Sequence, residues 1–378
     1  MIKKLVTSAL IIFVFLIQNI ILCPLASFAQ ETENITFQKA QQILLRNTKS
    51  LMDMETQIYN LKQDYERALS YEIDEEIWYN SDSYRRAQLL KRKELTPLQI
   101  EHTLLSTQEN SRTTRNNLIL NLRDRYLSLL LAKQDLDIKN SKYLIAYRAH
   151  EINKKKFDNK LISYLELQES EYSLFSSQTE LNISRRNYEN TCRNLNLFMG
   201  YPIDVIYSKV DYELLDKQPI YALSYCVENA LKNRREIKSL QRELSLKRLQ
   251  KELIERNNVH IAYASASEEH KSLVSAIDLL ELQLQKVTYD IKKEITDTYY
   301  SVMDAWKAIE SAEKRLDGIK AKQYLTEAKI KAGVVPESMA EQVKLEIQQA
   351  EYGILNAIFI YNTALIRLSS AAELNINQ

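Results

Sequence analysis

The sequence predicts an all-α protein built from long antiparallel helical hairpins, and two observations lead to this fold class. The 378 residues include only 4 Gly and 5 Pro, far below the roughly 7% and 5% of average usage. Because Gly and Pro supply the turns that sheets and short loops need, a chain this poor in both runs in long elements. Good helix formers such as Leu, Lys, Glu and Gln are abundant. With 45% hydrophobic and 27% charged residues, the composition is typical of a folded chain.

The first segment, residues 1–29, has the pattern of a secretory signal peptide. Two lysines precede an apolar run from Leu5 to Leu22, Pro24 follows the run, and Ser27-Phe28-Ala29 supplies small residues for a signal peptidase. An uncleaved membrane anchor is the alternative, because the run approaches the length of a short transmembrane span. Cleavage removes two lysines and no acid, which changes the formal net charge from +1 to −1. Neither form presents a basic field that attracts nucleic acid.

The rest of the chain contains a weak internal repeat in consistent register. Residues 37–68 match 223–254 at a shift of 186, and residues 123–200 match 296–373 at a shift of 173. The repeat predicts a first helical unit over 30–200, a linker over 201–220 and a second helical unit over 221–378. Matched pairs include Ala40 with Cys226, Asn47 with Asn233, Tyr188 with Tyr361, Cys192 with Leu365, and Leu195 with Leu368.

The repeat also informs the two cysteines that remain after the signal peptide. Cys226 matches Ala40 and Cys192 matches Leu365, and both partners are apolar packing residues. This favours two small buried hydrophobes over a disulfide, although an exported pair of cysteines allows either.

The stretch from about Lys271 to Lys331 carries a coiled-coil pattern. Apolar or small residues recur in alternating steps of four and three, with one extra step of four that is typical of a stutter. Some 60 residues at 1.5 Å each make a rod of roughly 90 Å, which needs antiparallel neighbours to cover its apolar stripe. The pattern consists of Leu280, Leu284, Val287, Ile291, Ile295, Thr298, Val302, Ala305, Ile309, Ala312, Leu316 and Ile319.

Each unit turns back on itself at a short tip. In the second unit, Gly333 suits a left-handed helix end and Pro336 suits the start of a return helix over 337–372. In the first unit, helices of about 112–157 and 164–198 flank a tip where Asn159 is expected to take the cap conformation and Ser163 to begin the return. Both tips present apolar residues whose exposure is unfavourable unless a partner docks there: Leu161, Ile162, Val334 and Val335.

This organisation resembles the TolC-like outer-membrane efflux family over about residues 35–374. The resemblance rests on the duplicated unit, the Leu-Lys-Asn-x-x-x-Ile start at Leu231, the Gly333-Val334-Val335 tip, and Tyr188-x6-Leu195-x4-Gly200. It implies a homotrimer whose helices form a duct in the cell envelope, between an inner-membrane pump and the outer membrane. It also implies that a periplasmic adaptor protein contacts the tips. By position, the tip residues are Lys160, Leu161, Ile162, Gly333, Val334 and Val335.

Two features depart from the family pattern near the tips. Lys160 stands where the family usually has Gly, and Met339 and Gln342 stand where members can carry a ring of acids at the duct entrance. Nearby acids are the candidates for that ring, with a solvated helix face as the alternative for all of them. These candidates are Glu166, Glu169, Glu337 and Glu341.

A third departure concerns the membrane strands that the family places between its long helices. A spanning strand needs about 9–11 alternating residues. Only Val259 to Ala266 alternates in the second unit, and Tyr71 to Tyr79 carries four acids in the first. Residues 83–112 are expected to be helical with an interruption at Pro97. We therefore expect a TolC-like helical architecture with little or no β-barrel.

Residues with catalytic chemistry do not form a recognisable pattern. The four histidines are scattered without a carboxylate or cysteine at ligand spacing, and no two glycines lie within ten residues. We therefore expect no enzyme, no cofactor and no metal site. The sequence leaves two hypotheses: the helical duct of an efflux or secretion system, or a non-conducting coiled-coil scaffold of the cell envelope that derives from such ducts.

Overall fold

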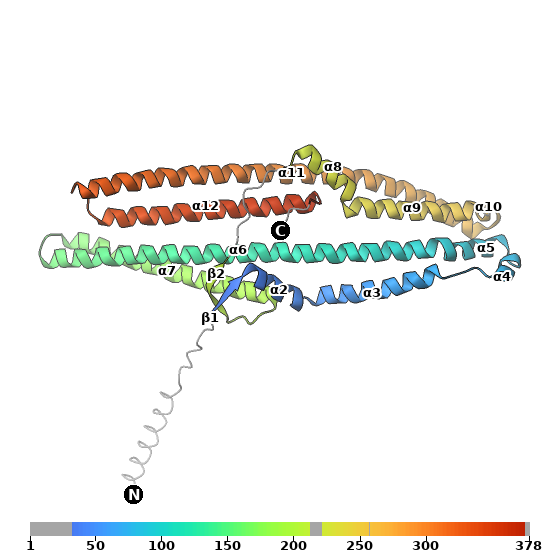
Figure 1. The fold of residues 1–378 in the computed structure, drawn as a ribbon, viewed down its shortest axis with the longest axis horizontal. Helices are drawn as coiled ribbons and strands as arrows, with labels where there is room; N and C mark the ends of the chain where they lie inside the picture. Colours follow the sequence, from blue (N-terminus) through green and yellow to red (C-terminus); the bar gives the residue numbers. More distant parts are fainter. Residues whose placement is uncertain (1–31, 212–220, 257, 375–378) are drawn as a thin grey trace, which may run out of the picture.

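The computed structural model describes residues 32–211, 221–256 and 258–374, which form one long rod (Figure 1). Two helices, α6 (Thr96–Asp158) and α11 (Ala264–Lys331), extend along the rod. Their 63 and 68 residues make cylinders of about 95 and about 100 Å at 1.5 Å per residue. The predicted all-α class is confirmed.

The two halves of the chain contribute similar elements in the same order. The first half contains β1 (Thr32–Thr36), α2 (Phe37–Asn47), α3 (Lys49–Leu69), α4 (Glu75–Tyr79), α5 (Ser83–Leu90), the π-helix η1 (Lys91–Leu95), α6, α7 (Tyr164–Met199) and β2 (Ile206–Asp211). The second half contains α8 (Leu223–Asn233), α9 (Arg235–Arg256), α10 (Val259–Ala262), α11 and α12 (Ser338–Ala371).

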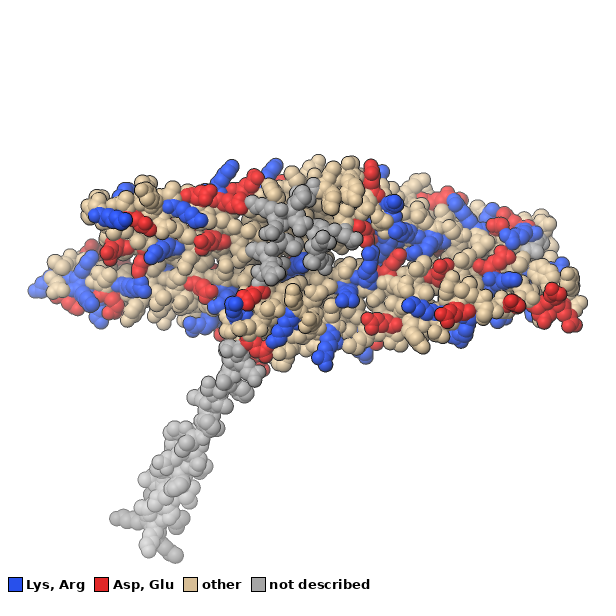
Figure 2. Space-filling model, viewed as in Figure 1, with Lys and Arg blue, Asp and Glu red and all other residues tan. Residues whose placement is uncertain are grey.

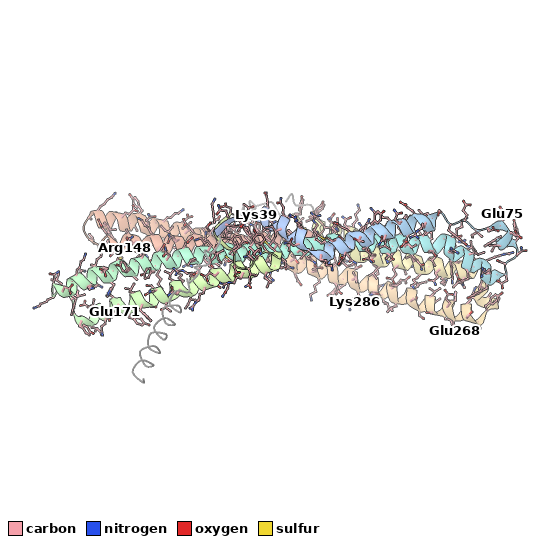
Figure 3. The ribbon with its side chains drawn as sticks, turned by 90° about the horizontal axis from the view of Figure 1, so that it is seen from below. Lys39, Glu75, Arg148, Glu171, Glu268 and Lys286 are labelled. Carbon is pink, nitrogen blue, oxygen red and sulfur yellow. The ribbon has the colours of Figure 1, made fainter. Side chains whose placement is uncertain are left out.

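The long helices lie in a row, so the chain forms a wall (Figure 1). In the half of the rod that holds the hairpin turns, α7 packs on α6, α6 on α12, and α12 on α11. In the other half, α3 packs on α6, α6 on α9, and α9 on α11. Figure 3 marks the two ends: Arg148 and Glu171 lie toward the hairpin turns, and Glu75 and Glu268 toward the opposite end. The helix α11 is therefore one edge of the wall, and α7 and α3 form the other edge.

Each half has its own apolar core in the middle of the rod. The first core includes Ala40, Tyr188 and Leu195, and the second includes their repeat partners Cys226, Tyr361 and Leu368. The predicted heptad residues of α11 are buried or partly buried without exception, from Leu280 to Ile319. The two cysteines are buried and free, which confirms the prediction that they act as small hydrophobes.

Ion pairs join the two halves along α6. Arg148 pairs with Glu341 of α12, Asp124 with Arg367 of α12 at 3.2 Å, and Glu109 with Arg242 of α9 at 3.0 Å. Beyond the start of α6, Lys91 of η1 pairs with Glu269 of α11 at 2.7 Å. We call this line of contacts the inter-repeat seam. Elsewhere on the visible face, charges of both signs are interspersed (Figure 2).

Two helix boundaries differ from the sequence-based expectation. The helix expected over about 112–157 begins at Thr96 instead, with Pro97 in its first turn. The α-helix expected over 83–112 is interrupted by the π-helix η1 just before Pro97, which agrees with the expected interruption, because proline lacks the N–H and its ring does not fit the preceding turn of a regular α-helix. The second difference is that α11 begins at Ala264 rather than near Lys271.

The strands of the described residues are short. β1 and β2 pair in parallel, with Thr32 opposite Ile206 and Asp211 opposite Thr36, and this two-stranded sheet is not a barrel. The segments that were candidates for membrane strands contain α4, α10 and the start of α11. Among the described helices, α12 has the length and hydropathy to cross a membrane, but half of its apolar window is buried within the protein.

Some predictions concern residues outside the described ranges. The signal peptide over 1–29 lies outside them, as does the part of the predicted linker from 212 to 220. The unit boundaries that the repeat predicts remain a prediction.

Candidate functional site

The two hairpin tips have the same backbone. At the first tip, the N–H of Leu161 donates to the carbonyl of Lys156 at 2.8 Å, and the N–H of Lys160 donates to that of Phe157 at 2.8 Å. At the second tip, Val334 donates to Lys329 at 2.9 Å, and Gly333 donates to Ile330 at 2.9 Å. Both patterns are Schellman motifs, which satisfy the last carbonyls of a helix. All four pairs obey the shift of 173, so the repeat extends to single hydrogen bonds.

One expectation about the first tip is wrong. Asn159 does not take the left-handed conformation, since its φ is −86°. Lys160 takes it instead with φ 60°, at the position that Gly333 occupies with φ 70°. The Schellman motif explains the difference, because its left-handed residue is fixed by the helix end and not by the local preference of Asn. Lysine therefore adopts a conformation here that is unfavourable for residues with a Cβ.

The apolar side chains at the tips differ in exposure. Leu161 is 73% exposed and its equivalent Val334 is 70% exposed. The neighbouring residues Ile162 and Val335 are partly buried. Each tip therefore presents one exposed aliphatic side chain followed in sequence by a partly buried one. Lysines occupy the last turns of both α6 and α11.

The candidate acids of the first tip have different surroundings. Ser163 is the N-cap of α7, as predicted, and forms a capping box with Glu166. The Glu166 carboxylate accepts from the Ser163 N–H at 2.7 Å and from its hydroxyl at 2.9 Å. The backbone hydrogen bond from Ser163 lowers the pKa of Glu166, so the carboxylate is held ionised at the helix start. Glu169 is exposed on α7.

The candidate acids of the second tip also separate into two kinds. Glu337 is exposed at the N-cap of α12 and makes no side-chain capping bond. Glu341 pairs with Arg148 of α6 and so belongs to the inter-repeat seam. Of the four candidates, Glu169 and Glu337 therefore project into solvent, whereas Glu166 and Glu341 stabilise the protein's own structure.

The edge helix α11 exposes apolar side chains on the face opposite its buried seam, where they alternate with exposed lysines such as Lys293 and Lys307. At 100° per residue, its exposed stripe of Leu282, Tyr289, Tyr300 and Leu325 stays within about 20° around the helix. The buried heptad seam lies on the other side, about 190° away. All four side chains of the stripe are at least 57% exposed. We call this surface the α11 edge stripe, and no element among residues 32–211, 221–256 and 258–374 covers it.

The opposite edge helix has the same two-faced pattern. In α7, Leu165, Tyr172, Ile183 and Leu197 lie within about 40° of one another, and each is at least 54% exposed. The buried residues Leu181, Tyr188 and Leu195 of α7 lie on the opposite side. This surface is the α7 edge stripe. Neither stripe was predicted from the sequence, although Tyr172 with Ile183 and Tyr289 with Tyr300 share an 11-residue spacing that keeps both residues on one helix face.

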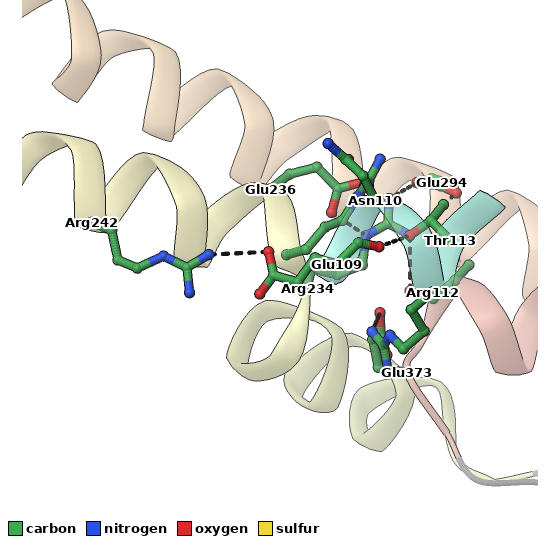
Figure 4. Close-up of polar contacts among 11 residues, drawn as sticks. Glu109, Asn110, Arg112, Thr113, Arg234, Glu236, Arg242, Glu294 and Glu373 are labelled. Carbon is green, nitrogen blue, oxygen red and sulfur yellow. Dashed lines mark hydrogen bonds and ion pairs between the residues drawn. The ribbon is translucent and has the colours of Figure 1, made fainter. Parts of the chain in front are cut away.

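A polar junction holds the halves together near the middle of the rod (Figure 4). Arg234, whose side chain is 13% exposed, binds Glu294 at 2.7 Å, Glu236 at 3.1 Å and the carbonyl of Ala371 at 3.0 Å. Arg112 of α6 binds Glu373 at 2.9 Å. Because a buried guanidinium needs acceptors, Arg234 ties the start of α9 to α11 and to the end of α12. Arg112 joins α6 to the residues that follow α12.

Histidine contacts differ from the scattered arrangement that the sequence suggested. The rings of His260 and His270 stack at 4.9 Å, and His270 Nε2 lies 2.7 Å from Glu255. Among residues 32–211, 221–256 and 258–374, however, no group of three or more His, Cys, Asp or Glu residues has an arrangement that could hold a metal ion. The pair therefore contributes to the packing of α9, α10 and α11.

Comparison with known proteins identifies the fold. No family model matches the sequence, and no curated protein matches it either. The structure is similar to the CmeC outer membrane channel of Campylobacter jejuni, with TM-score 0.62 and 12% identity over 89% of this chain and 85% of that chain. It is also similar to the outer membrane protein VceC of Vibrio cholerae, with TM-score 0.60 and 11% identity over 89% and 95%.

A membrane protein from Pseudomonas aeruginosa gives TM-score 0.62 and 11% identity over 89% of this chain and 90% of that chain. The matches cover nearly the whole rod, with both hairpins. The chain therefore has a TolC-like fold, the fold of these outer membrane channels.

Proposed function

We propose that this chain is a wall segment of a helical duct in the cell envelope, and that it works in transport rather than in catalysis. The observation that carries the proposal is the pair of edge stripes. The wall ends on α7 at one edge and α11 at the other, and each helix buries one apolar face and exposes the opposite one. Exposed apolar surface of this extent is unfavourable on an isolated protein.

A second copy of the chain is the proposed neighbour at each edge. The two stripes lie on different helices, so the contact joins the α7 edge of one copy to the α11 edge of the next. Such heterologous contacts close into a ring when the rotation between copies allows it. A homotrimer is the ring that the resemblance to TolC-like channels implies, and its lumen is the proposed path of the exported substrate.

The tips are the proposed docking site for a periplasmic adaptor protein that connects the duct to an inner-membrane pump. Support comes from Leu161 and Val334, which project from equivalent Schellman turns at the same end of the rod. The remaining tip residues Lys160, Ile162, Gly333 and Val335 set the backbone and the underlying packing of that surface. Glu169 and Glu337 are the acids proposed to face the duct entrance.

Charged substitutions at the tips test this proposal. The double variant Leu161→Asp/Val334→Asp is expected to lose capture by the periplasmic adaptor of the same host, because two charges replace the apolar contacts. A matched control places two charges at the opposite end with Tyr79→Asp/Ile261→Asp, at residues 75% and 76% exposed. Unchanged capture by the tip variant, or equal loss in the control, would contradict adaptor docking at the tips.

A non-conducting envelope scaffold is the second candidate, and the short two-stranded sheet of the described residues favours it. The two candidate functions predict different phenotypes for a strain in which the gene is deleted. A duct predicts that cells lacking the gene retain an efflux dye that wild-type cells expel, and that the tip variant does not restore efflux. Normal dye efflux in the deletion strain, together with an altered envelope, would favour the scaffold.

A further inference from the structure

We propose that a groove at the inter-repeat seam binds an amphipathic monoanion, that is, a single carboxylate or phosphate head attached to an apolar chain. The groove has a volume of about 930 Å³ and lies between α6, the C-terminal half of α12, and the start of α9. Its size is within the range of small-molecule sites. The junction of Figure 4 forms part of its lining. The inference does not depend on the duct.

Four of the five arginines that line the groove have acceptors within the protein. Arg112 binds Glu373 at 2.9 Å, and Arg234 binds Glu294 at 2.7 Å. Arg367 binds Asp124 at 3.2 Å, and Arg235 binds the side-chain oxygen of Asn110 at 2.7 Å. The contacts of Arg112, Arg367 and Arg235 join α6 to the second half of the chain, and that of Arg234 lies within the second half.

Arg123 is the exception. It lines the groove, is only 9% exposed, and forms no ion pair or hydrogen bond with the described part of the chain. Its Nε is buried without an acceptor. The guanidinium lies 5.2 Å from the centre of the Phe37 ring, a cation–π contact of about 0.5–2 kcal/mol. Because the Nε–H is buried without an acceptor, the aromatic contact alone leaves part of the desolvation cost uncompensated, and an anion in the groove compensates for it.

The rest of the lining sets the class of anion. Ile119, Leu120, Phe359 and Ile360 supply an apolar wall beside Arg123, which suits a hydrocarbon chain. Asp297 also lines the groove, and its carboxylate has no ion-pair partner in the described ranges. Because that charge opposes a second negative charge on the ligand, the site favours one charged head over a polyanion.

Titration of the purified full chain with decanoate, below its micellar concentration, tests the site. We expect saturable binding of one decanoate per chain by calorimetry, and much weaker binding of inorganic phosphate, which lacks an apolar chain. Arg123→Gln is expected to weaken decanoate binding at least tenfold, whereas Arg123→Lys retains the charge and most of the affinity. Arg125→Gln is the matched control, since Arg125 is exposed on the same helix and its guanidinium lies over Phe198 at 4.7 Å.

A second variant keeps the test decisive if Arg123→Gln does not fold. Ile360 is 49% exposed in the groove wall, so Ile360→Glu adds a negative charge there without emptying a core position. It is expected to abolish decanoate binding while circular dichroism stays unchanged. The proposal would be overturned if the wild-type protein did not bind decanoate, or if both groove variants bound it as tightly as the wild type does. Phosphate binding as tight as that of decanoate would also overturn it.

Discussion

The two halves of the molecule have equivalent backbone positions, but the side chains at these positions make different contacts. In the first half, Tyr188 donates to the carbonyl of Tyr207, and the amide of Asn196 donates to the carbonyl of Val205 at 2.8 Å. The hydroxyl of Tyr207 in turn donates to Asn196 Oδ1. In the second half, the equivalent of Tyr188 is Tyr361, which lies edge-on to Trp306 at 5.6 Å, and the equivalent of Asn196 is Ser369.

This comparison shows which properties of a duplicated unit persist. The Schellman turns at the tips and at the ends of α7 and α12 persist because backbone geometry imposes them. The side chains around them have diverged: Asn196 of the first half binds the carbonyl of Val205, whereas in the second half Asn229 binds the carbonyls of Ala372 and Glu373. Burial raises the pKa values of Tyr188 and Tyr207, which keeps both hydroxyls protonated as donors.

The largest expected effect follows from the buried amide of the first half. Asn196→Ala leaves the carbonyl of Val205 and the hydroxyl of Tyr207 without partners in a site with no exposure. We expect a loss of about 2–3 kcal/mol in the free energy of unfolding, because each orphaned buried group costs about 1–3 kcal/mol. Urea unfolding followed by circular dichroism measures this loss.

The equivalent substitution in the second half is the control for that comparison. Ser369→Ala is expected to cost less than about 1 kcal/mol, a typical small effect for a modest change of side chain. If both alanine variants lost the same stability, the two halves would depend equally on buried polar groups, and the comparison would fail.

A smaller effect is expected at the two tips, where one position holds Lys in the first half and Gly in the second. Lys160→Gly should raise the free energy of unfolding by about 0.5–1 kcal/mol, because it relieves a positive φ that costs about 1–2 kcal/mol for a residue with a Cβ. Gly333→Lys should lower it by a similar amount. A Cβ at Gly333 meets no atom within 4 Å, so the pair isolates backbone strain. Shifts of the same sign in both variants would argue against this explanation.

The smallest effect concerns an ion pair of the first hairpin and depends on pH. Hydrogen bonds from Lys142 and Lys139 lower the pKa of Glu180, whose repeat equivalent is Gly353. A carboxyl group whose pKa is lowered by folding stabilises the protein at pH values above its unfolded-state pKa of about 4.3. This stabilisation is lost as the pH falls through the folded-state pKa. Glu180→Gln should therefore lower the melting temperature slightly at pH 7 and not at pH 2. An equal difference at both pH values would exclude the ion pair as its cause.

Sequence patterns predicted the parts of the fold that depend on local physics. The scarcity of Gly and Pro, the heptad seam of α11 and the N-cap at Ser163 each specify a helix or its end without reference to the rest of the chain. The tips were located correctly for the same reason. The prediction that Asn159 takes the left-handed conformation failed because the position of that residue in a Schellman motif is fixed by the residue at which the helix ends. The conformational preference of Asn alone does not locate that residue.

Features that depend on neighbours were not predictable in this way. The edge stripes consist of ordinary apolar residues, and the order of helices in the wall is needed to show that no described element covers them. The arginines of the seam find partners across the two halves, as Arg112 does with Glu373, and the unpaired Arg123 is recognisable only against those pairs. Such long-range pairings require the tertiary arrangement.

The central claim is that copies of this chain associate edge to edge into a closed duct. The molar mass of the purified protein in solution, measured by light scattering during size-exclusion chromatography, tests it most directly. We expect a discrete species of three times the chain mass, held together along the α7 and α11 edges. A stable monomer at micromolar concentration would contradict the duct, since the exposed stripes would then have no partner of their own kind.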